Sequence, residues 1–212
     1  MAKVVVFGGT GYTGSHVVKE AASRGHEVVA VSRSQVQDPV AGVRYETGPA
    51  EDVAGRVVPG ADAVVAALSP RGETAGRLVD IYGTLVREAS DAGARYLQVG
   101  GFSSLRPAPD APRFVEGEIA AEYRDEALEG EATRVLLADY APEDLDWVFV
   151  SPAAEYGAWV PGERTGGQRV GGEVAILDEQ GHSFVSGADF AAAIVDEIED
   201  PQHHRAHIGV VG

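Results

Sequence analysis

The amino-acid sequence predicts an α/β fold, a doubly wound parallel sheet with helices on both faces. Short runs rich in β-branched residues alternate with stretches of helical periodicity through the first 150 residues, as in successive strand–helix–strand units. Several of these runs are apolar at nearly every position, which is typical of strands buried on both faces. Gly25 and Gly93 stand where two periodic stretches end, and glycine favours helix termination.

The first half of the chain opens with a strand and a helix. The run Lys3 to Phe7 predicts the first strand. Residues 12–24 predict a helix, because Val17, Val18 and Ala21 recur with helical spacing before Gly25. Three further strands are expected over residues 27–32, 43–46 and 61–67.

In the second half, a helix is expected over residues 73–91, followed by a strand over 95–99. Glycines, serines and prolines predict an irregular loop over residues 100–112. Acid-rich helical stretches are expected over about 115–140, with an interruption near Gly130. The remaining expected elements are strands over 147–150, 174–177 and 206–211 and a helix over 188–198.

No polar, flexible linker divides the sequence, so residues 1–212 are expected to form one domain. Residues of about 152–185, with glycine-rich turns at Gly166 and Gly171, are expected to form a small cap on the substrate side. The sequence does not distinguish a monomer from a homodimer.

Composition excludes several classes of function. With 17 basic and 33 acidic residues the formal charge is −16, which disfavours nucleic acid and anionic membranes as partners. The chain has no cysteine, so disulfides, thiolate nucleophiles and cysteine-ligated metals are excluded. No apolar run is long enough to span a bilayer, and the amino terminus lacks the pattern of a secretion signal, so we expect a cytoplasmic protein.

A glycine-rich turn joins the first strand to the first helix. Its glycines fit a GxGxxG pattern at Gly9, Gly11 and Gly14, or a GxxGxxG pattern with Gly8 in place of Gly9. Such a turn lets a diphosphate approach the backbone closely, and the helix start offers unpaired N–H groups and the positive end of a dipole. The motif predicts a Rossmann-type dinucleotide site, with NAD(H) or NADP(H) as the cofactor.

The end of the second strand favours NADP(H). An acid that would bind the free ribose 2′-hydroxyl is absent there, and Ser32-Arg33-Ser34 occupies its place. The Arg33 guanidinium suits a 2′-phosphate, which an acid would repel. The alternative is that Arg33 only decorates the loop.

These residues, together with Leu145 to Pro152 and Pro161 to Gly166, resemble the atypical short-chain dehydrogenases that bind NAD(P)H. Within that superfamily the chain is most similar to NADH-flavin reductases and biliverdin reductase B-like proteins, with NmrA-like redox sensors as more distant relatives. The resemblance implies that the cofactor lies across the carboxyl ends of the strands and touches loops at residues 67–69, 100–103 and 151–154.

The sequence departs from the superfamily at two places. Typical relatives have, soon after the third strand, an acid that reads the adenine amino group, and in this sequence Pro49 stands near that position. Tyr123 is followed four residues on by Ala127, where the superfamily's catalytic tyrosine has a lysine. The only lysines are Lys3 and Lys19, so proton transfer of the epimerase or alcohol dehydrogenase type is disfavoured.

Few other residues are candidates for chemistry. Ser103 and Ser104 follow the fifth strand, where a hydroxyl could bond the nicotinamide or an acceptor carbonyl, although serines in such turns are often local caps. Tyr156 and Trp159 could stack on an aromatic acceptor or pin their loop to the core. We expect no metal site at His203, His204 and His207 and interpret the acidic residues as a solvated helix face; they are Glu116, Glu118, Glu122, Asp125, Glu126 and Glu129.

The sequence therefore predicts an oxidoreductase that prefers NADPH and passes hydride to a small planar acceptor such as flavin or quinone. Two alternatives remain open, a non-catalytic NADP(H) sensor and a carbonyl reductase or epimerase acting through Ser103 and Tyr123. The predicted cofactor-contacting residues are Gly8, Thr10, Gly11, Tyr12, Thr13, Gly14, Arg33, Ala67, Leu68, Ser69, Gly100 and Pro152.

Overall fold

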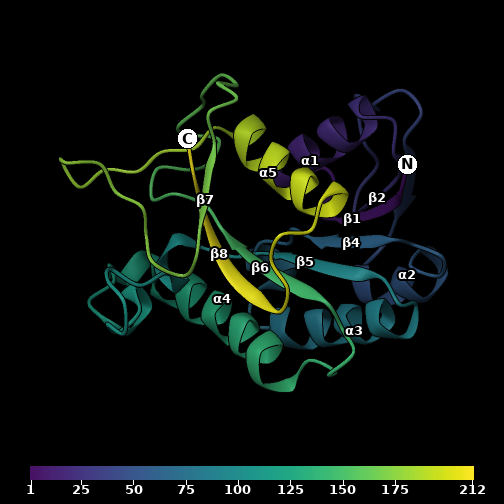
Figure 1. The fold of residues 1–212 in the computed structure, drawn as a ribbon. Helices are drawn as coiled ribbons and strands as arrows, with labels where there is room; N and C mark the ends of the chain where they lie inside the picture. The colour runs from purple at the N-terminus through teal and green to yellow at the C-terminus, as the bar shows by residue number, and fades with distance from the viewer.

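A computed structural model describes residues 1–212 and contains one eight-stranded sheet (Figure 1). The strand order is β3-β2-β1-β4-β5-β6-β8-β7, and every neighbouring pair is parallel except β7 with β8. The strands are β1 (Lys3–Phe7), β2 (Glu27–Ser32), β3 (Arg44–Thr47), β4 (Ala63–Ala66), β5 (Arg95–Val99), β6 (Trp147–Ser151), β7 (Arg169–Gly171) and β8 (Ala206–Val211).

Helices cover both faces of the sheet (Figure 1). The helices are α1 (Tyr12–Ser23), α2 (Ala50–Val57), α3 (Leu78–Asp91), α4 (Ala121–Tyr140) and α5 (Gly187–Glu199), with 3₁₀ turns η1 (Gly72–Thr74), η2 (Phe102–Ser104) and η3 (Phe114–Glu116). Side chains of α1 and α5 share one core with Val4 and Val6, whereas those of α2, α3 and α4 share the other with Val5 and Phe7. Alternate residues of β1 thus face opposite layers, as the pleat of a strand requires. This architecture confirms the predicted fold class.

The strand order reverses at β1. The chain runs outward from β1 through β2 to β3, then returns to place β4 on the other side of β1. In sheets of this kind the loops at the carboxyl ends of the strands diverge at such a reversal and leave a crevice for ligands. The glycine-rich turn follows β1 directly, so it lies at this point.

Several predicted boundaries are wrong. Helix α2 was not predicted, although Ala50, Val53, Ala54 and Val57 are buried at helical spacing. Helix α3 begins at Leu78, after the separate turn η1, rather than at residue 73. The expected strand over 174–177 is not formed beyond a single bridge at Val174, and β7 lies at 169–171 instead.

The predicted interruption of the acidic helix near Gly130 is also wrong. Helix α4 runs without a break through Gly130, and its contacts outweigh the modest helix propensity cost of one glycine. Its start is later than expected, because residues 114–116 form the separate turn η3.

Candidate functional site

One large cleft of about 1350 Å³ opens at the carboxyl ends of the strands. Its walls come from the turn after β1 and from the loops that follow β2, β4, β5 and β6, with contributions from α3 and α4. Eleven of the predicted cofactor-contacting residues line it, and Gly14 does not; Ser103 and Tyr123 line it as well. The crevice expected from the strand order is therefore present, with the predicted residues around it.

Three glycines of the turn are required by close packing. Gly8 has φ +82°, and a Cβ there would lie 2.4 Å from the Ala67 carbonyl oxygen. A Cβ at Gly14 would lie 2.1 Å from the Gly8 carbonyl oxygen, and one at Gly9 would lie 2.8 Å from the Ala30 Cβ. Neither a GxGxxG nor a GxxGxxG reading alone describes the turn, because Gly8 and Gly9 are both sterically restricted.

Gly11 differs from the other glycines of the turn. It is exposed, and a Cβ there would meet only the Gly8 carbonyl oxygen, at 3.2 Å. It is also the N-cap of α1, without a side-chain cap. A side chain at this position would project into the cleft rather than into the protein.

The head of α1 presents unpaired donors beside Gly11. The Gly11 N–H donates to the Gly8 carbonyl at 2.9 Å, and the Ser15 N–H donates to the Gly11 carbonyl at 2.9 Å. The N–H groups of Tyr12, Thr13 and Gly14 have no acceptor within the chain. Tyr12 and Thr13 line the cleft, so two free donors at the positive end of a helix dipole face it, which fits an anionic group such as a diphosphate.

Arg33 lies at the cleft beyond β2, as predicted. Its guanidinium pairs with Glu73 at 3.2 Å, but the Glu73 side chain is 85% exposed and the pair is accordingly weak. An incoming phosphate can replace such a partner. Two further arginines, Arg71 and Arg77, also line the cleft and were not singled out by sequence reasoning.

Side chains of α3 and the turn η1 hold the main chain of the loop after β4 in place. The Tyr82 hydroxyl, from α3, lies 3.1 Å from both the nitrogen and the carbonyl oxygen of Leu68. The Thr74 hydroxyl donates to the Ser69 carbonyl at 2.5 Å. Burial raises the pKa of Tyr82, which keeps this phenol protonated and able to donate. The predicted cofactor loop therefore has two side chains that hold its main chain.

The turn after β5 is held by a buried chain of hydrogen bonds. Arg113 can only donate, so its N–H donates a hydrogen bond to His207 Nδ1 at 3.2 Å. His207 Nε2–H then donates to the Ser151 hydroxyl at 2.9 Å, and Ser151 donates to the Gly101 carbonyl at 2.8 Å. Arg113 also donates to the Ser104 carbonyl at 2.6 Å. Both ends of the Gly101–Ser104 turn are thus tied to β6 and β8.

His207 is neutral in this chain. Burial lowers its pKa to about 3, and the Arg113 charge beside it acts in the same direction. In the sequence His207 lies close to His203 and His204. The structure separates them: His203 contacts Glu197 at 2.6 Å, and His204 contacts Asp146 at 3.0 Å.

The side chains of Ser103 and Tyr123 line the cleft, and neither hydroxyl makes a hydrogen bond within the protein. Tyr123 is 58% exposed on the first turns of α4, with Ala127 below it on the same cleft wall. The Lys3 ammonium group donates a hydrogen bond to the Pro59 carbonyl at 2.7 Å. Ala127 thus stands where a lysine would make the tyrosine a proton relay.

Tyr156 and Trp159 have different environments. The Tyr156 hydroxyl bonds that of Thr13 at 2.7 Å, and its ring packs on Tyr12 and Phe190, so it fastens its loop to α1 and α5. Trp159 is 71% exposed at the cleft mouth. Its ring covers Gly157, where a Cβ would lie 2.5 Å from the indole. Of these two residues, only Trp159 is free to contact an acceptor.

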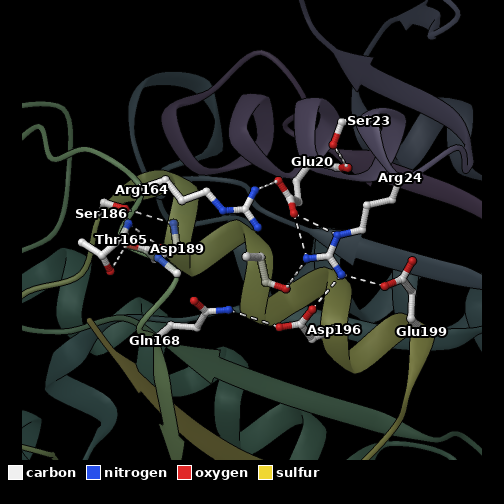
Figure 2. Close-up of polar contacts among 12 residues, drawn as sticks. Glu20, Ser23, Arg24, Arg164, Thr165, Gln168, Ser186, Asp189, Asp196 and Glu199 are labelled. Carbon is white, nitrogen blue, oxygen red and sulfur yellow. Dashed lines mark hydrogen bonds and ion pairs between the residues drawn. The ribbon is translucent and has the colours of Figure 1, made fainter.

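The Pro161 to Gly166 motif acts as an anchor (Figure 2). Asp189, fully buried at the start of α5, accepts hydrogen bonds from the N–H groups of Thr165 and Gly166 at 2.9–3.1 Å and from the Ser186 hydroxyl at 2.9 Å. Arg164 reaches Glu20 on α1 at 2.7 Å. Residues that suggested a functional motif instead hold the segment after β6 against α1 and α5.

The acidic stretch is only partly a solvated face. Glu129 accepts from the N–H groups of Gly76 and Leu78 at 2.9 and 2.8 Å and so caps α3. Glu126 forms a two-point contact with Arg71 at 3.0 and 3.1 Å. The interpretation as solvent-exposed carboxylates is wrong for these two residues, because partners 51–55 residues away meet α4 in space.

A mostly parallel sheet with this cleft at its strand ends and free amides at the head of α1 defines a Rossmann-like dinucleotide-binding protein. Residues 8–201 match the NAD(P)H-binding family, and the chain belongs to that family. No helix has the length and apolar character needed to cross a membrane.

Relatives extend over the whole chain. The uncharacterized protein YwnB of Bacillus subtilis is 33% identical, with 99% of this chain and 98% of that protein covered. Three solved structures are similar: a provisionally named exported protein of Burkholderia pseudomallei (36% identity, TM-score 0.86, both chains covered in full), a provisionally named epimerase of Bacteroides thetaiotaomicron (32%, 0.87, 99% and 96%) and a provisionally named NADH-flavin reductase of Streptococcus pneumoniae (27%, 0.85, 100% and 99%).

Proposed function

We propose that this protein is an NADPH-dependent reductase of a small planar acceptor, such as a flavin or a quinone. The observation that carries the proposal is the pair of unpaired N–H groups of Tyr12 and Thr13, which line the cleft next to the exposed Gly11. The similarity to a protein named as an NADH-flavin reductase supports the class of acceptor. NADPH, when bound, supplies a hydride for a two-electron reduction.

The chain's own residues bind and orient. Amides at the head of α1 receive the diphosphate, and Arg33 exchanges Glu73 for a 2′-phosphate. Tyr82 and Thr74 fix the main chain of Leu68 and Ser69, and the bonds from Ser151 and Arg113 fix the turn after β5. Hydride transfer between two stacked rings requires mainly such positioning, and the second hydrogen can come from water as a proton.

Two alternatives remain as rivals. The first is carbonyl reduction or epimerisation through Ser103 and Tyr123, and the Bacteroides relative is named as an epimerase. It is disfavoured because the Tyr123 hydroxyl has no hydrogen-bond partner and no lysine stands four residues further on. A non-catalytic NADP(H) sensor would have the same cofactor site. A cytoplasmic location completes the proposal, since a chain without cysteine needs no oxidising compartment.

Stopped-flow spectroscopy tests the proposal directly. NADPH absorbance is followed after mixing with protein alone, and after mixing with protein and riboflavin or menadione. The proposal expects loss of absorbance only with an acceptor and a slower reaction with NADH. Tight NADPH binding with no oxidation by any acceptor would establish the sensor, and turnover that is abolished in Tyr123→Phe would establish the rival carbonyl chemistry.

A further inference from the structure

The cleft has two chemically different ends. Arg33 and Glu51 follow β2 and β3, whereas the Gly101–Ser104 turn and Trp159 follow β5 and β6. With neighbouring strands about 4.8 Å apart, the exits of β2 and β5, three places apart in the sheet, are separated by roughly 14 Å. A volume of 1350 Å³ exceeds what one ligand site usually needs, so the two ends have room for two ligands.

The end beyond β5 and β6, here called the α4 half, is aromatic. Phe102 and Phe114 stack with their ring centroids 4.8 Å apart and both line the cleft. Tyr123 and Trp159 are 58% and 71% exposed, so much of each aromatic side chain is accessible, although the Trp159 ring packs on Gly157. The residues that define this half are Phe102, Phe114, Glu118, Ile119, Tyr123 and Trp159. Large exposed aromatic side chains around a cleft suit a flat, apolar ring system.

Charge in the cleft is almost fully paired. Its lining contains three arginines and four glutamates. Arg33 pairs with Glu73 at 3.2 Å, Arg71 with Glu126 at 3.0 Å and Arg77 with Glu51 at 2.8 Å. These three pairs leave Glu118, which is exposed and has no ion pair or hydrogen bond.

No unpaired cation lines the α4 half. Arg71 is held by both oxygens of Glu126. Arg113, behind the turn after β5, is buried and bonded to Glu173 and to the Ser104 carbonyl, and it does not line the cleft. Neutral His207 is likewise outside the lining. A phosphate in this half would meet the Glu118 carboxylate without an unpaired counter-ion, in a chain of net charge −16.

We propose that the α4 half binds a planar aromatic acceptor without a phosphate or carboxylate group, and that Glu118 selects riboflavin or an uncharged quinone over FMN or FAD. This inference rests on the proposed function. The reaction breaks the nicotinamide C4–H bond and oxidises NADPH to NADP⁺. The acceptor gains that hydride and one proton from water, a two-electron reduction.

Riboflavin and FMN differ by one phosphate and therefore form a matched pair of probes. Each is titrated into the full-length protein with saturating NADP⁺, and binding is followed by calorimetry and by quenching of tryptophan fluorescence. Riboflavin should bind about three- to tenfold more tightly than FMN, the range expected for one dianionic group near a solvent-exposed carboxylate. Since Trp147 is buried, Trp159→Leu should remove most of the quenching by both flavins.

Two Glu→Gln variants test whether Glu118 causes the difference in affinity between riboflavin and FMN. Glu118→Gln should bring the FMN affinity to within about twofold of the riboflavin affinity. Glu122→Gln, which removes an exposed carboxylate on the first turn of α4 that does not line the cleft, should leave the difference unchanged. If the difference between riboflavin and FMN affinity narrows equally in both variants, the effect is one of general charge, and the role of Glu118 is overturned.

FMN binding as tight as riboflavin binding in the unchanged protein would overturn the inference, while continued flavin reduction would leave the proposed function intact. If neither flavin nor menadione binds and none oxidises NADPH, the proposed acceptor class fails together with the inference. Retained NADPH binding in that experiment would leave only the cofactor assignment standing.

Discussion

The hydroxyl of Tyr82 bridges both main-chain polar groups of Leu68, at 3.1 Å from the nitrogen and 3.1 Å from the carbonyl oxygen. Tyr82 is fully buried in the layer of α2, α3 and α4, whereas Leu68 faces the cleft. A core side chain on α3 therefore sets the position of a loop in the candidate cofactor site. Replacing this tyrosine should affect both stability and binding.

Tyr82→Phe removes the hydroxyl and keeps the ring. Two partly buried main-chain groups of Leu68 lose their partner, so unfolding free energy should fall by about 1–3 kcal/mol. NADPH should also bind more weakly, because the 67–69 loop is released. Urea denaturation and calorimetric titration measure the two effects. Unchanged stability would show that the bridge contributes nothing net.

Arg33→Asp should reverse the cofactor preference. The substitution removes the guanidinium proposed to receive the 2′-phosphate and adds a carboxylate that repels it, so NADPH affinity should fall at least about tenfold while NADH affinity holds or rises. Arg56→Asp is the control, because Arg56 is similarly exposed but does not line the cleft. Equal losses for the two nucleotides would contradict the assignment of Arg33.

Gly11→Val and Gly14→Val should behave differently. At Gly11 the nearest atom to a Cβ is 3.2 Å away, so the variant should fold and lose dinucleotide binding by obstructing the diphosphate. At Gly14 a Cβ would lie 2.1 Å from the Gly8 carbonyl oxygen, so that variant should lose stability as well. Thermal unfolding and NADPH titration separate the effects. Wild-type affinity in a folded Gly11→Val protein would refute the role of the turn.

His207 should make stability depend on pH. Its pKa is about 3 in the folded protein and near 6.5 when unfolded, so the unfolded chain binds the extra proton between these values. Stability from the neutral imidazole is present above about pH 6.5 and is lost as pH falls toward 3, by at most about 1.4 kcal/mol per pH unit.

His207→Gln should flatten this pH dependence in urea denaturation between pH 4 and 7. Other groups also titrate in that range, so the slope is compared with that of the unchanged protein. His204→Gln is the matched control, because His204 is 64% exposed and pairs with Asp146 outside the cleft. Identical slopes in all three proteins would mean that His207 is not held neutral by its surroundings.

Local patterns predicted the fold and the framework of the site. The strand, glycine turn and helix over residues 3–23 are determined by residues close in sequence, and the boundaries there agree within one residue. Helix α2 was missed although its buried positions repeat at helical spacing, because eight residues give a short periodic signal. The break expected at Gly130 does not occur, because packing of a long helix outweighs the low helix propensity of one glycine.

Contacts between distant residues were not predictable in the same way. Arg113 meets His207 across 94 positions of sequence, and Arg164 meets Glu20 across 144. Neither residue has a local pattern that identifies its partner. The resemblance singled out residues 161–166, but only their contacts with Asp189 and Glu20 show that they act as an anchor. Ion pairing of the cleft arginines, and hence the isolation of Glu118, also required the structure.

The most direct test of the account follows the backbone amides at the head of α1. In ¹H–¹⁵N spectra of the full-length protein, NADPH should shift the signals of Tyr12 and Thr13 more than those of any other helix start, because these free donors in the cleft receive the diphosphate. If these two amide signals stay unchanged while NADPH saturates the protein, the nucleotide binds elsewhere and the account is wrong.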